Sequence, residues 1–413
     1  MNRSFTRGTL VVLAVCVLAD VAVAKPPSDV GTLPGFTLSR PKSIDNHGDI
    51  VGQVARAGPD DQAALWTRTD EGYSIEALPP LAGLLRGDAR AFGRRGAPVG
   101  YSYLPGAVSL FRAVVWREDP SGLRVPVDLE PPAGFTDALA FDANRHGLVV
   151  GEATNPRETV NGSTVRHAVA WLPEKGGDYE VLDLGVPEGY DVSSASGVNE
   201  LGEVVGTARR LESDGVGGLL LRATVVVWRP HRHHDRRCHG DTVVLPSDPD
   251  LPRNQNPAIN DSGLVVVQAE RATPGEPLVS RPLFWMRHHR GYAGPYELPL
   301  PETFTDGVAN DVNDTGLILG TAYVRPDAPG PAVASQAVLW AWSCARKGFA
   351  TTVLPNPPET ALVVAARLNE RGDAVGNAPL PAPGTSGGLL WKRKSATRWA
   401  AARPLLLPDL EGR

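Results

Sequence analysis

The sequence predicts an all-β fold: a seven-bladed β-propeller of about 54-residue four-stranded repeats that follows a cleaved signal peptide. Two observations predict it. A polar turn phrase that ends in glycine and leads into β-branched residues recurs along the chain, and a single tryptophan follows each copy. No stretch shows the period of an amphipathic helix. A solenoid would need distinct capping repeats, and the end copies here resemble the middle ones.

The turn phrase is the most regular part of the repeat. Its glycines are Gly48, Gly96, Gly147, Gly202, Gly263, Gly316 and Gly372. Three residues before them stand Asp45, Gly93, Asn144, Asn199, Asn260, Asn313 and Asn369. In an Asn-x-x-Gly turn the asparagine side chain bonds the turn backbone and glycine takes a positive φ. We therefore expect a hairpin in each copy, with a strand before and after the turn.

Two further strands complete each copy. The third ends at Trp66, Trp116, Trp171, Trp228, Trp285, Trp340 and Trp391, and the fourth runs into phrases such as Leu-Pro. Segment 31–39 and the C-terminal "LLLPDL" both resemble a fourth strand, and the sequence leaves open which of them completes the last blade. The second copy lacks the asparagine and carries Pro98 in its strand, so we expect the least regular blade there.

The N-terminus has the features of a secretory signal peptide. Residues 1–24 combine two arginines, an apolar run and an Ala-x-Ala cleavage sequence, so we expect residues 25–413 to form one secreted or periplasmic domain. No later apolar run is long enough to span a bilayer. The net charge of −5 is weak and interspersed, which does not favour nucleic acid as a partner, and we expect a monomer. Cys238 and Cys344 can pair in an oxidising compartment.

The repeat also resembles a known family. The phrase "VNDTGLILG", followed by "QAVLW" and "LP", is similar to the bacterial extracellular repeats called the HAF family, and segment 167–171, "HAVAW", is closest to the element that names them. The resemblance covers the whole chain after residue 24. It implies secretion and a repeat fold, and it carries no catalytic residues to transfer.

Two groups of residues are candidates for binding. One face of the predicted propeller carries the variable loops and the connections between blades, where aromatic and acidic residues recur at equivalent positions, joined by long polar side chains four residues before the tryptophans. This candidate ligand site comprises Phe135, Asp137, Tyr190, Asp191, Phe304, Asp306, Arg112, His167 and Arg281. These residues suit a carbohydrate, a cationic ligand or a metal, but the aromatics can equally pack between blades and each aspartate can cap its own turn.

The second group lies on the opposite face, after two of the tryptophans. It comprises His231, His233, His234, Cys238, His239, His288 and His289, which could bind a transition metal. The alternative is a solvated basic loop, since the spacing matches no zinc signature.

No motif identifies a reaction or requires a cofactor. The chain has no nucleophile elbow, phosphate loop, nucleotide fingerprint or His-Glu-x-x-His sequence. The sequence therefore favours a non-catalytic binding scaffold for a protein or glycan. The alternative is a lyase or hydrolase at the channel mouth, with Asp137, Asp191 and Asp306 acting together with His167 or Arg281.

Overall fold

The chain folds into β-strands throughout the part that the structure describes. The computed structural model describes residues 27–393 except 57–59, 107–109, 162, 214–218, 231–240, 274, 290, 327–330 and 380–385. This part holds strands β1 to β28 and one 3₁₀ turn, η1 (Arg94–Gly96), and it has no helix long and apolar enough to cross a membrane. The predicted all-β class is confirmed. The predicted signal peptide and the C-terminal "LLLPDL" lie outside the described residues.

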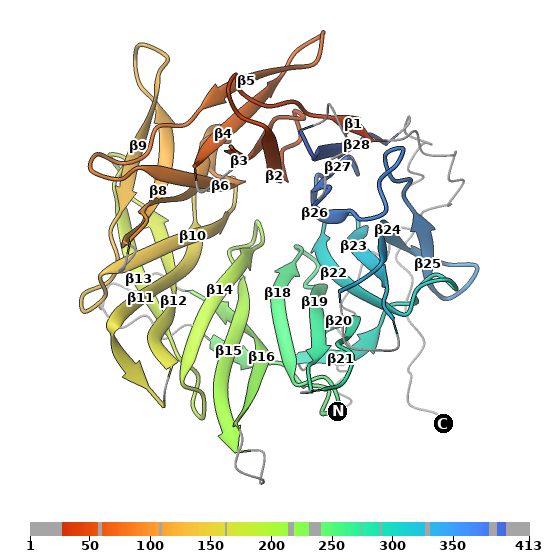
Figure 1. The fold of residues 1–413 in the computed structure, drawn as a ribbon. Coiled ribbons are helices and arrows are strands. Elements are labelled where there is room, and N and C mark those ends of the chain that lie inside the picture. The colour runs from red at the N-terminus through yellow and green to blue at the C-terminus, as the bar shows by residue number, and fades with distance from the viewer. Residues whose placement is uncertain are drawn as a thin grey trace, which may run out of the picture.

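The strands form antiparallel sets of four, which we number units 1 to 7. Units 1, 2, 3 and 6 are β2–β5, β6–β9, β10–β13 and β22–β25, and unit 7 is β26–β28 with β1. Units 4 (β14–β17) and 5 (β18–β21) are joined into one eight-stranded sheet by a single parallel pair, Ala223 with Arg253. Figure 1 shows the units following one another around a common centre, with the first strand of each nearest to it.

Strands in equivalent positions have similar lengths in most units. The first strands are β2 (Leu38–Ile44), β6 (Arg86–Phe92), β10 (Asp137–Ala143), β14 (Val192–Val198), β18 (Arg253–Ile259), β22 (Asp306–Val312) and β26 (Val364–Leu368). The second strands are β3 (Ile50–Ala55), β7 (Pro98–Leu104), β11 (Val149–Val160), β15 (Val204–Ser213), β19 (Val265–Arg271), β23 (Ile318–Val324) and β27 (Ala374–Asn377). The third strands are β4 (Asp61–Arg68), β8 (Leu110–Glu118), β12 (Ser163–Pro173), β16 (Leu219–Arg229), β20 (Val279–His288), β24 (Ala334–Ser343) and β28 (Gly388–Trp391). The fourth strands are β5 (Tyr73–Ala77), β9 (Arg124–Leu129), β13 (Tyr179–Gly185), β17 (Asp241–Val244), β21 (Gly291–Glu297), β25 (Gly348–Val353) and β1 (Ser28–Asp29).

The Asn-x-x-Gly phrase forms the turn that the sequence predicts. In unit 6 the N–H of Gly316 donates to the carbonyl of Asn313 (3.0 Å), and Gly316 has a φ of 77°. The N–H of Leu317 donates to Oδ1 of Asn313 (3.0 Å). The asparagine therefore holds its own turn through its side-chain oxygen, as expected.

The repeated tryptophan joins each unit to the one before it. All seven are buried, none more than 3% exposed. In six of them Nε1 donates to a backbone carbonyl just after the fourth strand of the preceding unit: Trp66 to Gly31, Trp116 to Pro79, Trp171 to Glu130, Trp285 to Pro246, Trp340 to Pro299 and Trp391 to Pro355, at 2.7 to 3.2 Å. Trp228 is the exception, since its buried Nε1 has no partner among the described residues.

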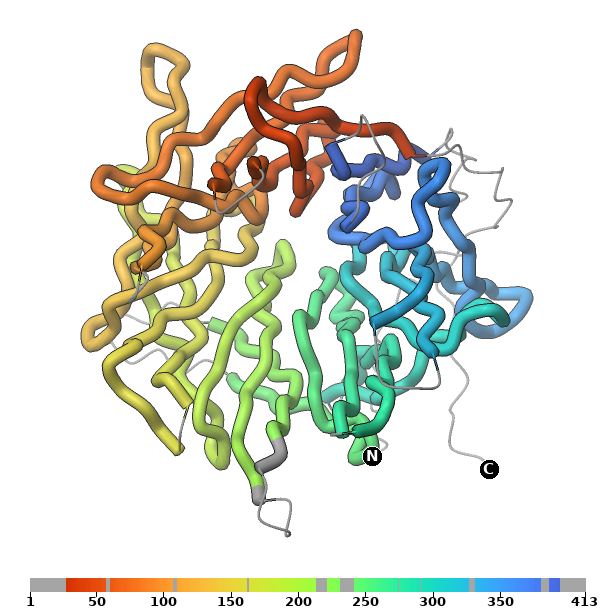
Figure 2. Tube along the Cα trace, viewed as in Figure 1, coloured from red at the N-terminus to blue at the C-terminus, as the bar shows by residue number. Residues whose placement is uncertain are grey.

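The N-terminal end of the described chain supplies the fourth strand of unit 7. Ser28 pairs with Leu390 and Asp29 with Leu389, and the N–H of Val30 donates to the carbonyl of Gly388 (3.2 Å). Figure 2 shows these two ends of the chain, red and blue, side by side. The sequence left open which terminus supplies this strand. The strand consists of residues 28–29, which lie just before the candidate segment 31–39.

Every first strand contains a β-bulge at the same place. The register shifts at Lys42, Arg90, Phe141, Ser196, Asn310 and Ala366, each three residues before the turn residue, and across Asn256 and Pro257 in unit 5. A bulge leaves one residue unpaired and redirects its side chain. The side chain of the unpaired residue in each copy can therefore point away from the two faces of the sheet.

The bulge explains the second glycine of the repeat. Gly52, Gly100, Gly151, Gly206, Gly320 and Gly376 lie opposite it, and a Cβ on any of them would come within 3.0 Å of a carbonyl oxygen on the first strand. Unit 5 has Val267 at this position, and there the bulge has a different form, with Asn256 at a φ of 49°. Glycine is thus retained where the carbonyl approaches the second strand.

The second unit is more regular than expected. Pro98 begins β7 and pairs with Phe92, and β6 to β9 form a complete sheet. The departure is confined to the turn, where η1 replaces the asparagine turn and Arg95 has a φ of 59°. The shortest strand lies in unit 7 instead: β1 consists of Ser28–Asp29 only.

Replacing Trp340 with phenylalanine keeps most of the apolar contact and removes the bond to Pro299. We expect the Trp340→Phe variant to lose about 1–2 kcal/mol of unfolding free energy, measured by urea denaturation. Trp228→Phe is the matched control, because its Nε1 has no described partner to lose. Equal losses in the two variants would show that the hydrogen bond contributes nothing.

A methyl group opposite the bulge should strain the sheet. We expect Gly151→Ala to cost about 2–3 kcal/mol, since its Cβ would overlap the Leu139 carbonyl. Val267→Ala removes methyl groups at the equivalent place in unit 5 and tests that site without a clash. If Gly151→Ala melted at the wild-type temperature, the steric account of this glycine would be wrong.

Candidate functional site

The bulge residues surround a cavity at the centre of the molecule. Lys42, Arg90, Phe141, Ser196, Pro257, Asn310 and Ala366 all line it, one from each first strand. Ser194, Thr207, Arg209, Asn256, Ala258 and Arg367 complete the lining, and the volume is about 220 Å³. The regular bulge thus directs one side chain of every unit toward the same space, and that side chain differs in every copy.

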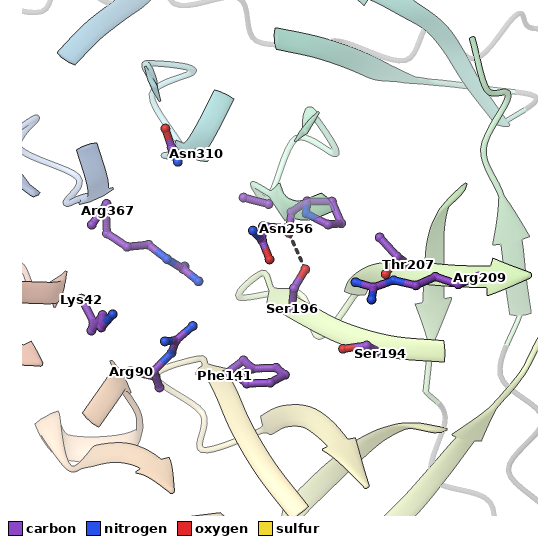
Figure 3. A pocket seen from close by; sticks show the side chains of 13 residues that line it. Lys42, Arg90, Phe141, Ser194, Ser196, Thr207, Arg209, Asn256, Asn310 and Arg367 are labelled. Carbon is purple, nitrogen blue, oxygen red and sulfur yellow. Dashed lines mark hydrogen bonds between the residues drawn. The ribbon is translucent and has the colours of Figure 1, made fainter. Parts of the chain in front are cut away.

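The charge of this lining is strongly one-sided. Lys42, Arg90, Arg209 and Arg367 are cationic, and no carboxylate is found among the described residues that line the cavity. Figure 3 shows the side chains of Lys42, Arg90 and Arg367 reaching into the space from one side and Arg209 lying across from them. Clefts lined by charge of one sign concentrate ligands of the opposite sign.

Two of the four cations have carboxylate partners just outside the lining. Arg367 Nη1 lies 3.3 Å from Oδ1 of Asp142 and 3.8 Å from Oδ1 of Asp311. Arg90 Nη1 lies 3.2 Å from Oδ2 of Asp88. Burial raises the pKa of Asp311 to about 6, although Arg367 opposes that rise. These pairs neutralise part of the positive charge.

Lys42 and Arg209 form no ion pair with a described residue. Burial lowers the pKa of Lys42, and the neighbouring Arg90 and Arg40 lower it further while Asp88 opposes them. Burial also lowers the pKa of Arg209, and Arg166 and Arg253 act in the same direction. A bound anion would stabilise both charged forms.

Neutral hydrogen-bonding groups lie between the cations. The hydroxyl of Ser196 donates to the carbonyl of Pro257 (2.7 Å), as drawn in Figure 3. The side chains of Ser194, Thr207 and Asn256 form no hydrogen bond with any other described residue. The cavity therefore offers free donors and acceptors as well as positive charge.

Above the cavity, on the face of the turns, the asparagines form a ladder between units. Nδ2 of each donates to the backbone carbonyl of the next turn residue: Asn144 to Asn199, Asn199 to Asn260, Asn260 to Asn313, Asn313 to Asn369 and Asn369 to Asp45, at 2.9 to 3.1 Å. The turn residue thus stabilises its own hairpin with Oδ1 and the neighbouring unit with Nδ2.

A second ladder of carboxylates follows the first. The N–H of Arg145, Glu200, Asp261, Asp314 and Glu370 donates in turn to the side chain of Glu200, Asp261, Asp314, Glu370 and Asn46. Burial, with Asp314, Asp311 and Asp261 nearby, raises the pKa of Glu370 to about 7. Burial also raises the pKa of Glu200 and Asp314. The ladder thus links four carboxylates, Glu200, Asp261, Asp314 and Glu370, on adjacent turns.

The three aspartates of the candidate ligand site all bond the backbone. Oδ1 of Asp137 accepts the N–H of Phe111 (2.8 Å), and Oδ1 of Asp306 accepts that of Ser280 (2.7 Å), each from the preceding unit. Oδ2 of Asp191 accepts the N–H of Leu211 (3.0 Å). They lie on separate units, and none lines the central cavity.

The basic residues of that group pair with carboxylates of their own units, and Arg281 also with one of the next unit. Arg112 forms an ion pair with Asp128, and Nδ1 of His167 lies 2.8 Å from Oδ2 of Asp183. Arg281 pairs with Glu297 (3.4 Å) and also lies 3.5 Å from Asp306. Each side chain on the third strand therefore meets a carboxylate on the fourth strand or on the next unit.

The aromatic members of the group pack against separate clusters. Phe135 lies 4.9 Å, centroid to centroid, from the ring of His167 and packs on the core of units 2 and 3. Tyr190 stacks under Arg210 at 5.4 Å, and Phe304 packs on the core that contains Trp340. The structure brings Phe135 near His167, and a ligand site there stays a prediction.

Most of the candidate metal group lies outside the described residues, namely His231, His233, His234, Cys238 and His239. His288 and His289 are exposed, with ring centroids 3.9 Å apart. The described residues contain no group of three or more His, Cys, Asp or Glu side chains that could hold a metal. Cys344 is disulfide-bonded, and both other cysteines of the sequence lie outside the described part.

The central cavity was missed because its residues vary. Alignment of the seven copies reveals the positions at which one residue type recurs. The lining position has a different residue in each copy: Lys, Arg, Phe, Ser, Pro, Asn and Ala. A usable signal was present: the position lies three residues before the turn residue, and four of its seven residues, Lys42, Arg90, Ser196 and Asn310, are polar or charged.

Comparison with known proteins yields likeness of fold only. No family model and no curated protein matches the chain. Among solved structures, one described as YjhT is 13% identical, with 79% of this chain and 100% of that chain covered and a TM-score of 0.44. A polysaccharide lyase described as an ulvan lyase is 12% identical, covering 76% and 82%, with a TM-score of 0.42. A sialidase from Trypanosoma rangeli with the inhibitor DANA is 11% identical, covering 90% and 58%, with a TM-score of 0.40.

The carboxylate ladder predicts a pH dependence of stability. The pKa of Glu370 rises from its ordinary 4.5 to about 7 in the folded protein, so the folded state holds the proton more tightly. Between these values the free energy of unfolding should fall as pH rises. Glu370→Gln keeps an acceptor for Asp314 and removes the titration. We expect a shallower fall in melting temperature from pH 5 to pH 8, and an unchanged slope would contradict the assignment.

Proposed function

We propose that this chain is a binding protein whose central cavity takes up a small organic anion. The observation that carries the proposal is the lining itself: four cationic side chains and no described carboxylate, with Lys42 and Arg209 lacking ion pairs. The volume of about 220 Å³ lies below the ~300 Å³ at which pockets for drug-sized ligands begin, which favours a small molecule over a polymer.

We propose that units 1 to 7 are the blades of a closed seven-bladed β-propeller. The pairing of β1 with β28 supports closure, as does the bond from Asn369 of unit 7 to Asp45 of unit 1 (2.9 Å). The bond from Trp66 to Gly31 matches the link found between other neighbouring units. Closure would pack unit 1 against unit 7, and Ile50 and Trp66 share a buried apolar cluster with Val375 and Leu390.

We propose further that the chain is a secreted or periplasmic member of the HAF repeat family. The turn phrase with its tryptophan and the features of residues 1–24 support this assignment. The disulfide at Cys344 is in keeping with an oxidising compartment.

A non-catalytic role fits the geometry best. Asp137, Asp191 and Asp306, the carboxylates of the enzymatic alternative, each accept a backbone N–H and lie on separate units. Just outside the cavity lining, Asp142 and Asp311 are held by Arg367 and by the backbone N–H groups of Val198 and Leu368. These carboxylates serve the scaffold, and Lys42 and Arg209 are left for the ligand.

Binding can be measured by calorimetry on residues 25–413 with D-galactonate, citrate, phosphate and sulfate as probes. We expect at least one organic anion to bind, more weakly as salt increases, and Lys42→Gln with Arg209→Gln to weaken it about tenfold or more. Arg124→Gln is the control, because Arg124 pairs with Glu76 on an outer strand. Absence of binding by every anion would overturn the proposal.

A further inference from the structure

Both ends of the cavity are cationic. At the first, Lys42 of unit 1 and Arg90 of unit 2 line the space, and Arg40 lies close enough to act on Lys42. Asp88 is the one carboxylate whose charge acts on Lys42, and it is already engaged by Arg90 and by the hydroxyl of Tyr101, each at 3.2 Å. At this end, three cations therefore share one carboxylate, which already has an ion pair and a hydrogen bond.

The second end repeats this imbalance on other units. Arg209 of unit 4 lines the cavity, with Arg166 of unit 3 and Arg253 of unit 5 as its cationic neighbours. Glu152 is the carboxylate that acts on Arg209, and its Oε2 already lies 3.5 Å from Nη1 of Arg166. Here too, three cations face one occupied carboxylate.

Uncharged side chains lie between the two ends. Figure 3 shows Lys42 and Arg90 on one side and Arg209 on the other, with Phe141, Ser196 and Asn256 between them. Arg367 also reaches in from the side of the first end, and its charge is paired with Asp142 and Asp311. Asn256 forms no side-chain hydrogen bond with a described residue, and Nδ2 of Asn310 has no described acceptor. Phe141 adds an apolar surface. The middle thus suits a short chain that carries hydroxyl groups.

Resting on the proposed function, we infer that the ligand is a single dianion, a hydroxylated dicarboxylic acid whose ends are held by Lys42 with Arg90 and by Arg209. Each carboxylate would complete the pairing of an end that has an excess of cations. A ligand with one carboxylate would leave the other end uncompensated, and an inorganic anion would leave the amide and hydroxyl groups of the middle without partners.

The matched probes are open-chain sugar derivatives of the same configuration that differ in the number of carboxylates. Galactitol has none, D-galactonate has one and galactarate has two, and threonate and tartrate form a shorter pair. We expect the dicarboxylate of at least one length to bind about tenfold more tightly than its monocarboxylate, and galactitol to be the weakest. Calorimetry should also give a stoichiometry of one.

Single variants then assign the ends. Lys42→Gln and Arg209→Gln should each reduce the affinity for the better dicarboxylate to about that of the wild type for the monocarboxylate. Either variant should still bind the monocarboxylate, through the end that it retains. Thermal unfolding of both variants, with Arg124→Gln as control, separates a loss of binding from a loss of folding.

The outcomes distinguish this inference from the proposed function. If monocarboxylates and dicarboxylates of both lengths bound equally well, the cavity would bind anions but the two-ended inference would be wrong. A stoichiometry of two monocarboxylates per chain, with no gain for the dicarboxylate, would overturn it in favour of separate anion sites. If no anion bound, the proposed function itself would fail.

Discussion

The structure depends on the contact between each unit and its neighbour. A sheet of four short strands buries too little apolar surface to be stable alone, so each must pack on the next. The tryptophan of the third strand fixes this packing, because its ring is buried and, in six units, its Nε1 donates to one carbonyl of the preceding unit. The asparagine ladder adds a second link between units 3, 4, 5, 6, 7 and 1. Where both links are present, neighbouring units have little freedom to slide or tilt.

This constraint sets the cavity. When the first strands are held around a common centre, a residue that bulges from each of them must point toward that centre. The glycine opposite the bulge permits the arrangement by leaving room for a carbonyl oxygen. A scaffold that is the same in every unit therefore presents a different side chain from each, and the chemistry of the cavity can change while the packing does not.

Carboxylates and cations also occupy different parts of the structure. Carboxylates such as Asp142, Asp311 and Glu203 neutralise arginines inside the scaffold, and those of the turn face bond the backbone of the adjoining unit. The cations of the central cavity are only partly neutralised. Lys42 and Arg209 are partly buried and have no ion pair among the described residues, and a bound anion would offset the cost of their desolvation.

The sequence by itself determined the strands, the turns and the repeat, because these depend on local backbone preferences and on a side-chain pattern that recurs seven times. Asn313, Gly316 and Trp340 hold the positions that their phrase predicts. Only the tertiary structure decided that β1 completes the last unit and that Lys42, Arg90 and Arg209 face one space. Their proximity arises from strands far apart in the chain, and a residue at a β-bulge points to neither face that strict alternation would assign. The candidate ligand site on the loops was inferred from residue types that recur at equivalent positions of the repeat. Residues that recur in this way are the ones that hold the units together.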